Sequence, residues 1–221
     1  YFNTWKFRHP DEAAIQNVFE TTSGKSLGWF FNGMIDSNSK SDAKICKVNT
    51  DSGGTDVLLK NRGNLAMPVN VSFYNKEKLI ASQWTGVFDG KFKLSSSVSG
   101  ADKIVLDTYD QSLDLNPFNN SMKTKGVFRK WKPLQLRFLT MLENPERTQL
   151  FYLPAVAYNN YNGWMAGVIL HNYSLLSKKF EFGIVPMYAF KSKSVAGVAT
   201  ASYQFNIYNG WFDRIIAKIS P

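Results

Sequence analysis

The middle of the chain alternates between apolar and polar residues in short runs. These runs are AKICKV, TDVLLKN, VNVSFYN, LIASQWTG, FKLSSS and KIVLDT, and the turn-forming segments SGG, RGN, NKEK, DGK and SGAD separate them. Short alternating runs with a turn about every 8–12 residues are typical of an all-β sandwich. We therefore predict an antiparallel β-sandwich over residues 43–115, ending in the turn-rich segment DLNPFNN.

A second alternating region, residues 148–221, has longer runs. They are TQLFYLPAVAY, GWMAGVILHNY, KFEFGIVPMYAF and SVAGVATASYQF, and GWFDRIIAKIS begins a fifth. One face of the third and fourth runs is bulky and apolar: Phe180, Phe182, Ile184, Tyr188 and Phe190, then Val195, Ala199, Tyr203 and Phe205. The opposite face carries small and partly polar residues: Glu181, Gly183, Val185 and Ala189, then Ala196, Thr200, Ser202 and Gln204.

Long strands that are apolar on one face, with aromatic residues toward their ends, are typical of outer-membrane barrels. Five strands are too few to close a barrel, because about eight are needed. A soluble meander packed on a helix would have the same alternation. The pattern therefore predicts a β-meander resembling the start of an outer-membrane β-barrel, and it leaves membrane insertion open.

Before residue 37 the spacing of apolar residues is helical. Asp11 is a good N-cap for AAIQNVFE, and Gly24 is a good C-cap. A second amphipathic helix follows, with Leu27, Phe30, Phe31, Met34 and Ile35 on one stripe. The fold class is therefore mainly β, with a short helical pair over residues 1–36 ahead of the sandwich.

Residues 116–147 connect the two β regions and are basic. Between 123 and 137 the segment has Lys and Arg but no acidic residue, and Phe128 and Trp131 stand among the cations. Base-stacking platforms for nucleic acid have this composition, and so do segments beside a membrane. With no further motif nearby, nucleic acid is the less favoured partner.

Charge and aromatic content add to this picture of the chain. The 221 residues carry a net charge of +9, which permits an anionic membrane surface, nucleic acid or an acidic partner. Of the 33 aromatic residues, 15 lie in residues 150–221.

The chain starts without Met, in YFNTWKF, and we expect it to be a fragment of something larger. Its one cysteine, Cys46, is expected to be a small buried hydrophobe.

Side chains that could perform catalysis are scarce. His9 is expected at the surface, and His171 on the small-residue face of its strand, and neither has a second histidine at ligand spacing. The carboxylate pairs Glu143 and Glu146, and Asp107 and Asp110, lie in turn-rich stretches, where we expect solvated or capping roles. We therefore assign no catalytic, cofactor-binding or metal-binding residue.

The stretch YFNTWKFRHPDEAAIQNVFETTSGKSLGWFFNGMI resembles the end of the catalytic region in gluzincin zinc aminopeptidases of the aminopeptidase N type. Positions that match the family's S/T-G-K-x-L-x-x-F-F pattern are Ser23, Gly24, Lys25, Leu27, Phe30 and Phe31. The chain differs at Ser26 and Met34, where the family usually has an acidic residue and a Trp.

The resemblance continues into the β regions. VLLKNRGNLAMPVNVSF is similar to the sandwich that follows the peptidase domain, and LDLNPFNN resembles the loop that ends it in bacterial envelope relatives. The segment PLQLRFLTMLENPERTQLFYLPAVAYNNYNGWMAGV looks like the entry into a barrel of the surface-antigen or outer-membrane type. The family's zinc-binding and exopeptidase motifs match nothing in this chain, so its zinc is expected only in the parent protein.

The resemblance implies a non-catalytic C-terminal segment of an aminopeptidase-like metalloprotease. Such a segment would support the upstream peptidase domain and tether it at the cell envelope, in the outer membrane or on its periplasmic or extracellular side. Its partners would be that domain and the outer membrane. The alternative is a stand-alone β-sandwich that binds glycan or nucleic acid through a cationic surface.

Overall fold

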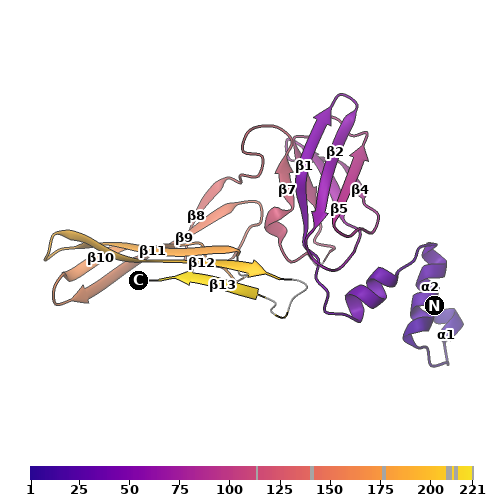
Figure 1. The fold of residues 1–221 in the computed structure, drawn as a ribbon, viewed down its shortest axis with the longest axis horizontal. Helices are drawn as coiled ribbons and strands as arrows, with labels where there is room; N and C mark the ends of the chain where they lie inside the picture. Colours follow the sequence, from indigo (N-terminus) through magenta and orange to yellow (C-terminus); the bar gives the residue numbers. More distant parts are fainter. Residues whose placement is uncertain (113, 140–141, 176–177, 208–210, 212–213, 221) are drawn as a thin grey trace. The chain divides into compact units, whose positions relative to one another are not determined.

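The computed structural model describes residues 1–112, 114–139, 142–175, 178–207, 211 and 214–220. The chain divides into two compact units, Tyr1–Lys130 and Trp131–Pro221. The fold is mainly β, with short helices at the N-terminus, as the sequence predicts (Figure 1). Each unit has its own sheets, and each is described below by itself.

The first unit begins with three short helices: α1 (Phe2–Trp5), α2 (Glu12–Ser23) and η1 (Trp29–Ile35). The predicted caps of α2 are confirmed. The backbone N–H of Ala14 donates to Asp11 Oδ1 at 2.8 Å, and Gly24 takes the left-handed conformation with φ 64°. These contacts satisfy backbone groups that a helix end leaves unpaired.

The second predicted helix is a π-helix, not an α-helix. The hydrogen bond typical of a π-helix closes its last turn: the backbone N–H of Asp36 donates to the carbonyl of Phe31, five residues earlier, at 3.0 Å. The wider turn breaks the expected apolar stripe: Phe31 is buried, whereas Ile35 is exposed. Gly33 allows close packing inside the unit, because a Cβ there would lie 2.7 Å from Leu65 Cδ1.

The predicted β-sandwich is present. One sheet has the order β1-β2-β5 and the other the order β4-β3-β6-β7. The strands are β1 (Ala43–Asp51), β2 (Gly54–Asn61), β3 (Asn70–Asn75), β4 (Lys78–Trp84), β5 (Lys91–Ser96), β6 (Lys103–Leu106) and β7 (Ser121–Lys123). Apolar side chains from both sheets form one buried core, which includes Ile45, Val57, Leu59, Val71, Phe73, Ile104 and Leu106. Burial of these side chains is the main stabilising term for the sandwich.

The sandwich extends past residue 115, its predicted end. The short helix η2 (Pro117–Asn119) leads into β7, which pairs antiparallel with β6, and Met122 of β7 is part of the core. The expected connector 116–147 is therefore shared between the two units, because its first part completes one sheet of the sandwich.

Cys46 is half-buried and not part of the core, contrary to the expectation. In the pairing of β1 with β2, Ile45 lies opposite Leu59 and Lys47 opposite Leu58. Cys46 is the extra residue of a β-bulge, which local sequence does not reveal.

The second unit is one six-stranded sheet with the order β13-β12-β11-β10-β9-β8. Its strands are β8 (Leu134–Phe138), β9 (Thr148–Asn159), β10 (Gly163–His171), β11 (Phe180–Ala189), β12 (Ser194–Asn206) and β13 (Arg214–Ile219). Neighbours from β9 to β13 are antiparallel, as predicted for the meander, whereas β8 pairs parallel with β9. The described strands form an open sheet with β8 and β13 as its edges. Residues 176–177, which lie between the second and third predicted runs, and residues 210, 212 and 213 of the fifth run lie outside the described residues.

Candidate functional site

Strand register assembles one continuous apolar face across the six-stranded sheet. Tyr152 of β9 lies opposite Leu170 of β10, Leu170 lies opposite Ile184 of β11, and Ile184 lies opposite Ala199 of β12. Residues directly opposite in neighbouring strands point to the same side of a sheet. The two edges continue the face, because β8 places Phe138 beside Tyr152 and β13 places Ala217 beside Tyr203.

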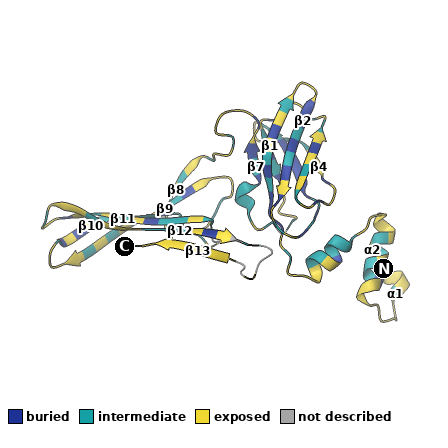
Figure 2. Ribbon diagram, in the orientation of Figure 1, coloured by how far each residue is buried: buried dark blue, intermediate teal, exposed yellow. Residues whose placement is uncertain are grey.

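Among the described residues of the six strands, no side chain on this face is charged. The face consists of Leu134, Leu136, Phe138, Thr148, Leu150, Tyr152, Pro154, Val156, Tyr158, Trp164, Ala166, Val168, Leu170, Phe180, Phe182, Ile184, Pro186, Tyr188, Val195, Gly197, Ala199, Ala201, Tyr203, Phe205, Ile215, Ala217 and Ile219. Many of its large side chains are exposed (Figure 2), including Val156 at 70% and Trp164 at 63%. We call this surface the apolar face.

Aromatic side chains on the apolar face lie in two bands. At one end of the sheet are the ring pairs Tyr158–Trp164 (5.4 Å) and Tyr188–Phe190 (5.5 Å). At the other end are Phe180–Phe182 (5.9 Å) and Tyr203–Phe205 (4.7 Å). Between these bands β11 and β12 carry aliphatic or small residues, Ile184, Pro186, Gly197 and Ala199, and the pair Phe138–Tyr152 (5.6 Å) lies in the same row as Ile184. Tyr188 is six positions after Phe182, which corresponds to roughly 20 Å along a strand.

The opposite face of the sheet is smaller and more polar, as predicted, and it is partly covered. His171 lies on it, 6% exposed, with its ring 5.5 Å from that of Phe151 and 5.4 Å from that of Tyr173. Tyr173 lies across Gly183, where a Cβ would approach the ring to 3.0 Å, and its Oη is 2.7 Å from Thr200 Oγ1. The aromatic ring thus occupies space that only glycine leaves open.

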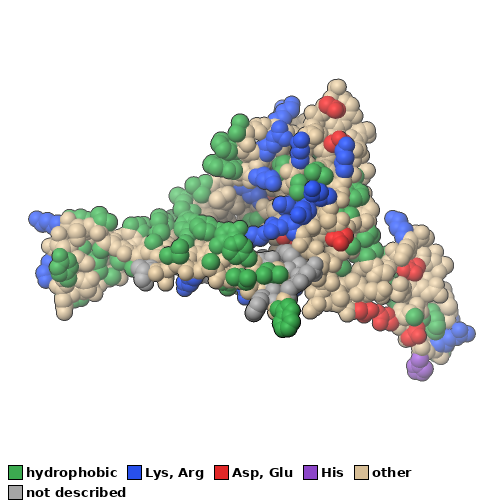
Figure 3. Space-filling model, in the orientation of Figure 1, with side chains coloured by type: hydrophobic (Ala, Val, Ile, Leu, Met, Phe, Trp, Pro, Cys, Tyr) green, Lys and Arg blue, Asp and Glu red, His purple; other side chains and the backbone are tan. Residues whose placement is uncertain are grey.

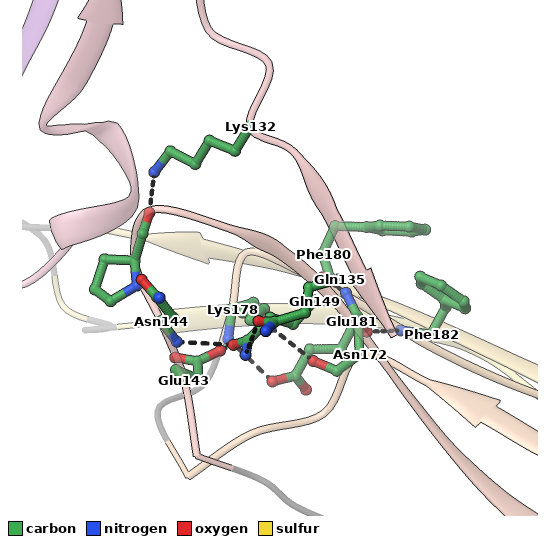
Figure 4. A network of polar contacts seen from close by, with 11 residues as sticks. Lys132, Gln135, Glu143, Asn144, Gln149, Asn172, Lys178, Phe180, Glu181 and Phe182 are labelled. Carbon is green, nitrogen blue, oxygen red and sulfur yellow. Dashed lines mark hydrogen bonds and ion pairs between the residues drawn. The ribbon is translucent and has the colours of Figure 1, made fainter. Parts of the chain in front are cut away.

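A buried ion pair is also part of the second unit. Lys178 Nζ lies 2.7 Å from Glu143 Oε1, and the two side chains are only 16% and 9% exposed. Figure 4 shows the network around them, in which Gln149 accepts from the N–H of Asn144 and donates to Gln135. This arrangement corrects the expectation for Glu143, which is neither solvated nor a cap but a buried partner of a lysine.

The environment of His171 disfavours its charged form. Burial lowers the pKa of His171 below its ordinary value, and the nearby charge of Lys178 lowers this pKa further. His171 Nδ1 is buried and forms no hydrogen bond with the described part of the chain. The imidazole is therefore packed within the polar face of the sheet. The sequence predicted on which face His171 lies, but not that Phe151 and Tyr173 pack against its ring.

The outer face of the sheet β1-β2-β5 carries lysines in rows. Lys44, Lys60 and Lys91 lie directly opposite one another, and Lys47 and Lys93 flank Leu58 in the next row. Like charges placed opposite each other destabilise a sheet, so the arrangement has a stability cost. Asp56 partly offsets it through an ion pair with Lys93 at 2.8 Å. We call this surface the lysine face, and Figure 3 shows Lys and Arg side chains gathered on the sandwich.

The basic connector is less available for ligand than its composition indicates. Arg129 Nη1 donates to the carbonyl of Val48 at 3.0 Å, and Lys132 Nζ donates to the carbonyl of Pro145. Phe128 and Trp131 are 61% and 70% exposed. Local sequence does not predict the lysine face, since its rows form only when β5 pairs with β2, to which β5 is not adjacent in sequence.

The other residues considered from sequence do not form a catalytic group. Asp107 caps a turn, accepting from the N–H of Gln111 (2.7 Å) and from the hydroxyl of Ser112 (2.6 Å). His9 lies exposed in the first unit, whereas His171 belongs to the second. Across the described residues, no group of three or more His, Cys, Asp or Glu side chains is placed to hold a metal ion.

Comparisons with protein-family models, with curated proteins and with solved structures gave no match. None of the described helices is long and apolar enough to span a membrane.

Proposed function

We propose that this chain is a membrane-anchoring segment, in which the six-stranded sheet turns its apolar face toward the lipid of an outer membrane. The observation that carries the proposal is the uncharged apolar face with its two aromatic bands. Lipid-facing surfaces of outer-membrane barrels have an apolar band about 25 Å tall between two aromatic girdles. The spacing of roughly 20 Å between the bands is measured along a strand, and a tilt of about 40° reduces it to about 15 Å across the membrane, so the bands enclose the central part of such an apolar band.

Physical chemistry favours a lipid environment over water for this face. Exposed apolar patches on soluble proteins seldom exceed a few hundred Å², whereas this one extends over six strands. The edges β8 and β13 limit how the sheet inserts, because unpaired backbone groups in hydrocarbon cost several kcal/mol each. The proposal therefore includes pairing of both edges by further strands, which closes the sheet before or during insertion.

The domain that the sheet would anchor is inferred from the resemblance of residues 1–36 and of the sandwich to a zinc aminopeptidase. In this proposal the sandwich supports an upstream peptidase domain, and the sheet tethers that domain at the cell envelope. Zinc and the exopeptidase chemistry belong to the upstream domain, and this segment contributes attachment and support.

Fractionation of the cells that make the protein tests the proposal. We expect the protein in the outer-membrane fraction, where it resists extraction by 1 M salt and by alkaline carbonate but dissolves in detergent. Resistance to salt is expected because burial of apolar side chains is not screened, whereas attachment by surface charge is. Recovery of the protein in the soluble fraction, or its release by salt alone, would contradict the anchor.

The lysine face supports a second candidate function, binding of an anionic glycan or nucleic acid by the sandwich. Its lysines carry a stability cost that an anionic ligand would offset. Binding of this kind weakens steeply as salt rises, because counterions are released from the polyanion. The double variant Lys60→Gln/Lys91→Gln should then bind a polyanion such as heparin more weakly than the matched pair Lys76→Gln/Lys78→Gln in the β3–β4 hairpin. Equal binding by the two variants would remove this candidate.

A further inference from the structure

The loop that follows β7 presents apolar side chains to solvent. Val127 is 91% exposed and Phe128 is 61% exposed. Exposed lysines stand on both sides of this pair, Lys125 before it and Lys130 after it. We call residues 125–130 the loop tip. Apolar side chains this exposed contribute little to folding, because folding removes little of their surface from water.

The base of this loop is held by the sandwich. The N–H of Lys123 donates to the carbonyl of Arg129 at 2.9 Å, which closes the loop. Thr124, only 4% exposed, donates through its hydroxyl to the carbonyl of Ala101 at 2.7 Å. Arg129 also reaches the edge strand β1, where its Nη1 donates to the carbonyl of Val48 at 3.0 Å. The loop tip is therefore an exposed apolar projection on a fixed support.

The surroundings of the loop tip are cationic. Residues 121–130 include four Lys and Arg residues and no Asp or Glu. Strand β1, to which the loop is hydrogen-bonded, also carries part of the lysine face, and its Lys47 is exposed. Asp102 lies near the base of the loop, but its carboxylate accepts from the N–H of Lys76 at 2.8 Å. A partner that fits the loop tip therefore combines negative charge with an apolar phase.

We propose that the loop tip docks on a lipid surface that carries anionic headgroups. Val127 and Phe128 enter the interface of the bilayer. Lys125 and Lys130 lie at the level of the lipid phosphates, because lysines beside an anionic leaflet are attracted by its charge. Nucleic acid or an anionic glycan would also attract the lysines, but it offers no apolar phase to an aliphatic residue such as Val127. The contact belongs to the sandwich and does not depend on insertion of the six-stranded sheet.

A local fluorescent probe in the whole chain tests this contact. Cys46→Ser removes the native thiol, and Val127→Cys then carries an environment-sensitive dye. We expect the dye to shift to the blue with vesicles of equimolar phosphatidylcholine and phosphatidylglycerol, and to shift much less with phosphatidylcholine alone. The matched control is the same dye at Val87→Cys, an exposed valine between β4 and β5, at the edges of the two sheets opposite to β7 and β1. There the dye should keep its emission in water.

Variants separate docking from mere exposure. Lys125→Gln/Lys130→Gln should lower the ratio of docked to free loop about tenfold or more, since each lysine adds to the attraction by an anionic surface. The matched pair, Lys25→Gln/Lys40→Gln, removes two exposed lysines ahead of β1 and should leave this ratio unchanged. Phe128→Ser should also lower the ratio, because an apolar side chain no longer leaves water.

The outcomes distinguish this contact from the membrane anchor. Flotation of the chain with vesicles in high salt reports on the six-stranded sheet, whereas the dye at position 127 reports on the loop tip. An unshifted dye on a chain that floats would overturn the docking and leave the anchor intact, and a shifted dye on a chain that high salt releases would do the reverse. Equal shifts at positions 127 and 87, equal shifts with both kinds of vesicle, or a response to heparin without a response to vesicles would overturn the assignment to anionic lipid.

Discussion

Lys178 Nζ lies 2.7 Å from Glu143 Oε1 in an environment that excludes most water from both side chains. Lys178 also donates to the carbonyl of Asn172 at 3.0 Å, so one ammonium joins the loop before β9 to the segment between β10 and β11. A buried ion pair contributes little net stability compared with an apolar pair. Removing one partner is costly, however, because the other charge stays buried alone.

Glu143→Ala is therefore expected to lower the free energy of unfolding by about 3 kcal/mol or more. The matched control is Asp56→Ala, which breaks the Lys93–Asp56 pair of nearly the same length, 2.8 Å. That pair is exposed to solvent, so its loss should lower the free energy of unfolding clearly less than Glu143→Ala does. Urea unfolding followed by tryptophan fluorescence measures both variants. Equal costs for the two variants would show that Glu143 is not buried with Lys178 as described.

Gly167 tests how closely β10 and β11 approach each other. A Cβ at this position would lie 2.1 Å from the carbonyl oxygen of Pro186, so Gly167→Ala forces the two strands apart. We expect a loss of about 1–3 kcal/mol in the free energy of unfolding. At Gly86 a Cβ meets no described atom within 4 Å, and Gly86→Ala should stay within about 0.5 kcal/mol of the wild type. If the two alanine variants are equally stable, the pairing of β10 with β11 is not the one described.

His171 should make the stability of the second unit depend on pH. Burial, and then the charge of Lys178, lower the pKa of His171 in the folded protein below its ordinary value. Between the lowered pKa and about 6.5 the unfolded chain binds the proton more readily, so stability rises with pH there. The contribution of neutral His171 is complete above about pH 6.5 and is lost as the pH falls through that window. Glu143 and Glu181 also lie near Lys178, so their titration must be separated from that of His171.

The comparison of wild type with His171→Gln isolates this effect, since the variant keeps a polar side chain but does not titrate. Unfolding measured between pH 5 and pH 8 should show a smaller loss of stability at low pH for the variant. A constant difference between the two proteins across this range would contradict a lowered pKa for His171.

The proposed function assigns no catalytic residue to this chain, and this leads to a fourth prediction. The chain by itself should not hydrolyse aminoacyl chromogenic substrates, with or without added zinc. An activity that is lost on addition of a chelator would show that the segment carries its own metallopeptidase site and would contradict the supporting role.

Local pattern predicts most of this fold, because alternation and turn residues act over a few positions. The runs around Phe180 and Tyr203 gave the correct strands and the correct faces, and the caps Asp11 and Gly24 were found from residue type. Strands β7 and β8 were overlooked inside the connector, although the alternation of LQLRF was visible in the sequence. A short strand is stabilised mainly by its neighbour, and its own sequence indicates it only weakly.

The remaining features depend on which distant segments meet. The bulge at Cys46 follows from the register of β1 with β2, and the lysine face requires β5 to pair with β2. The burial of Glu143 depends on Lys178, 35 positions further along the chain. Proximity of Asp42 to Asn119, across 77 positions, likewise exists only in the folded sandwich. These contacts cannot be predicted from residue type and spacing along the chain.

Lysine substitutions at two neighbouring positions of β11 test the membrane anchor most directly. Ile184 belongs to the apolar face, whereas Val185 points to the polar face, opposite Val198. A lysine on a lipid-facing strand costs about 2–4 kcal/mol at the middle of a membrane, whereas positions on the polar side tolerate charge. The measurement is the amount of each variant of the full-length protein in the outer-membrane fraction. The account predicts that Ile184→Lys is depleted there and that Val185→Lys assembles like the wild type, and equal tolerance of the two substitutions would contradict it.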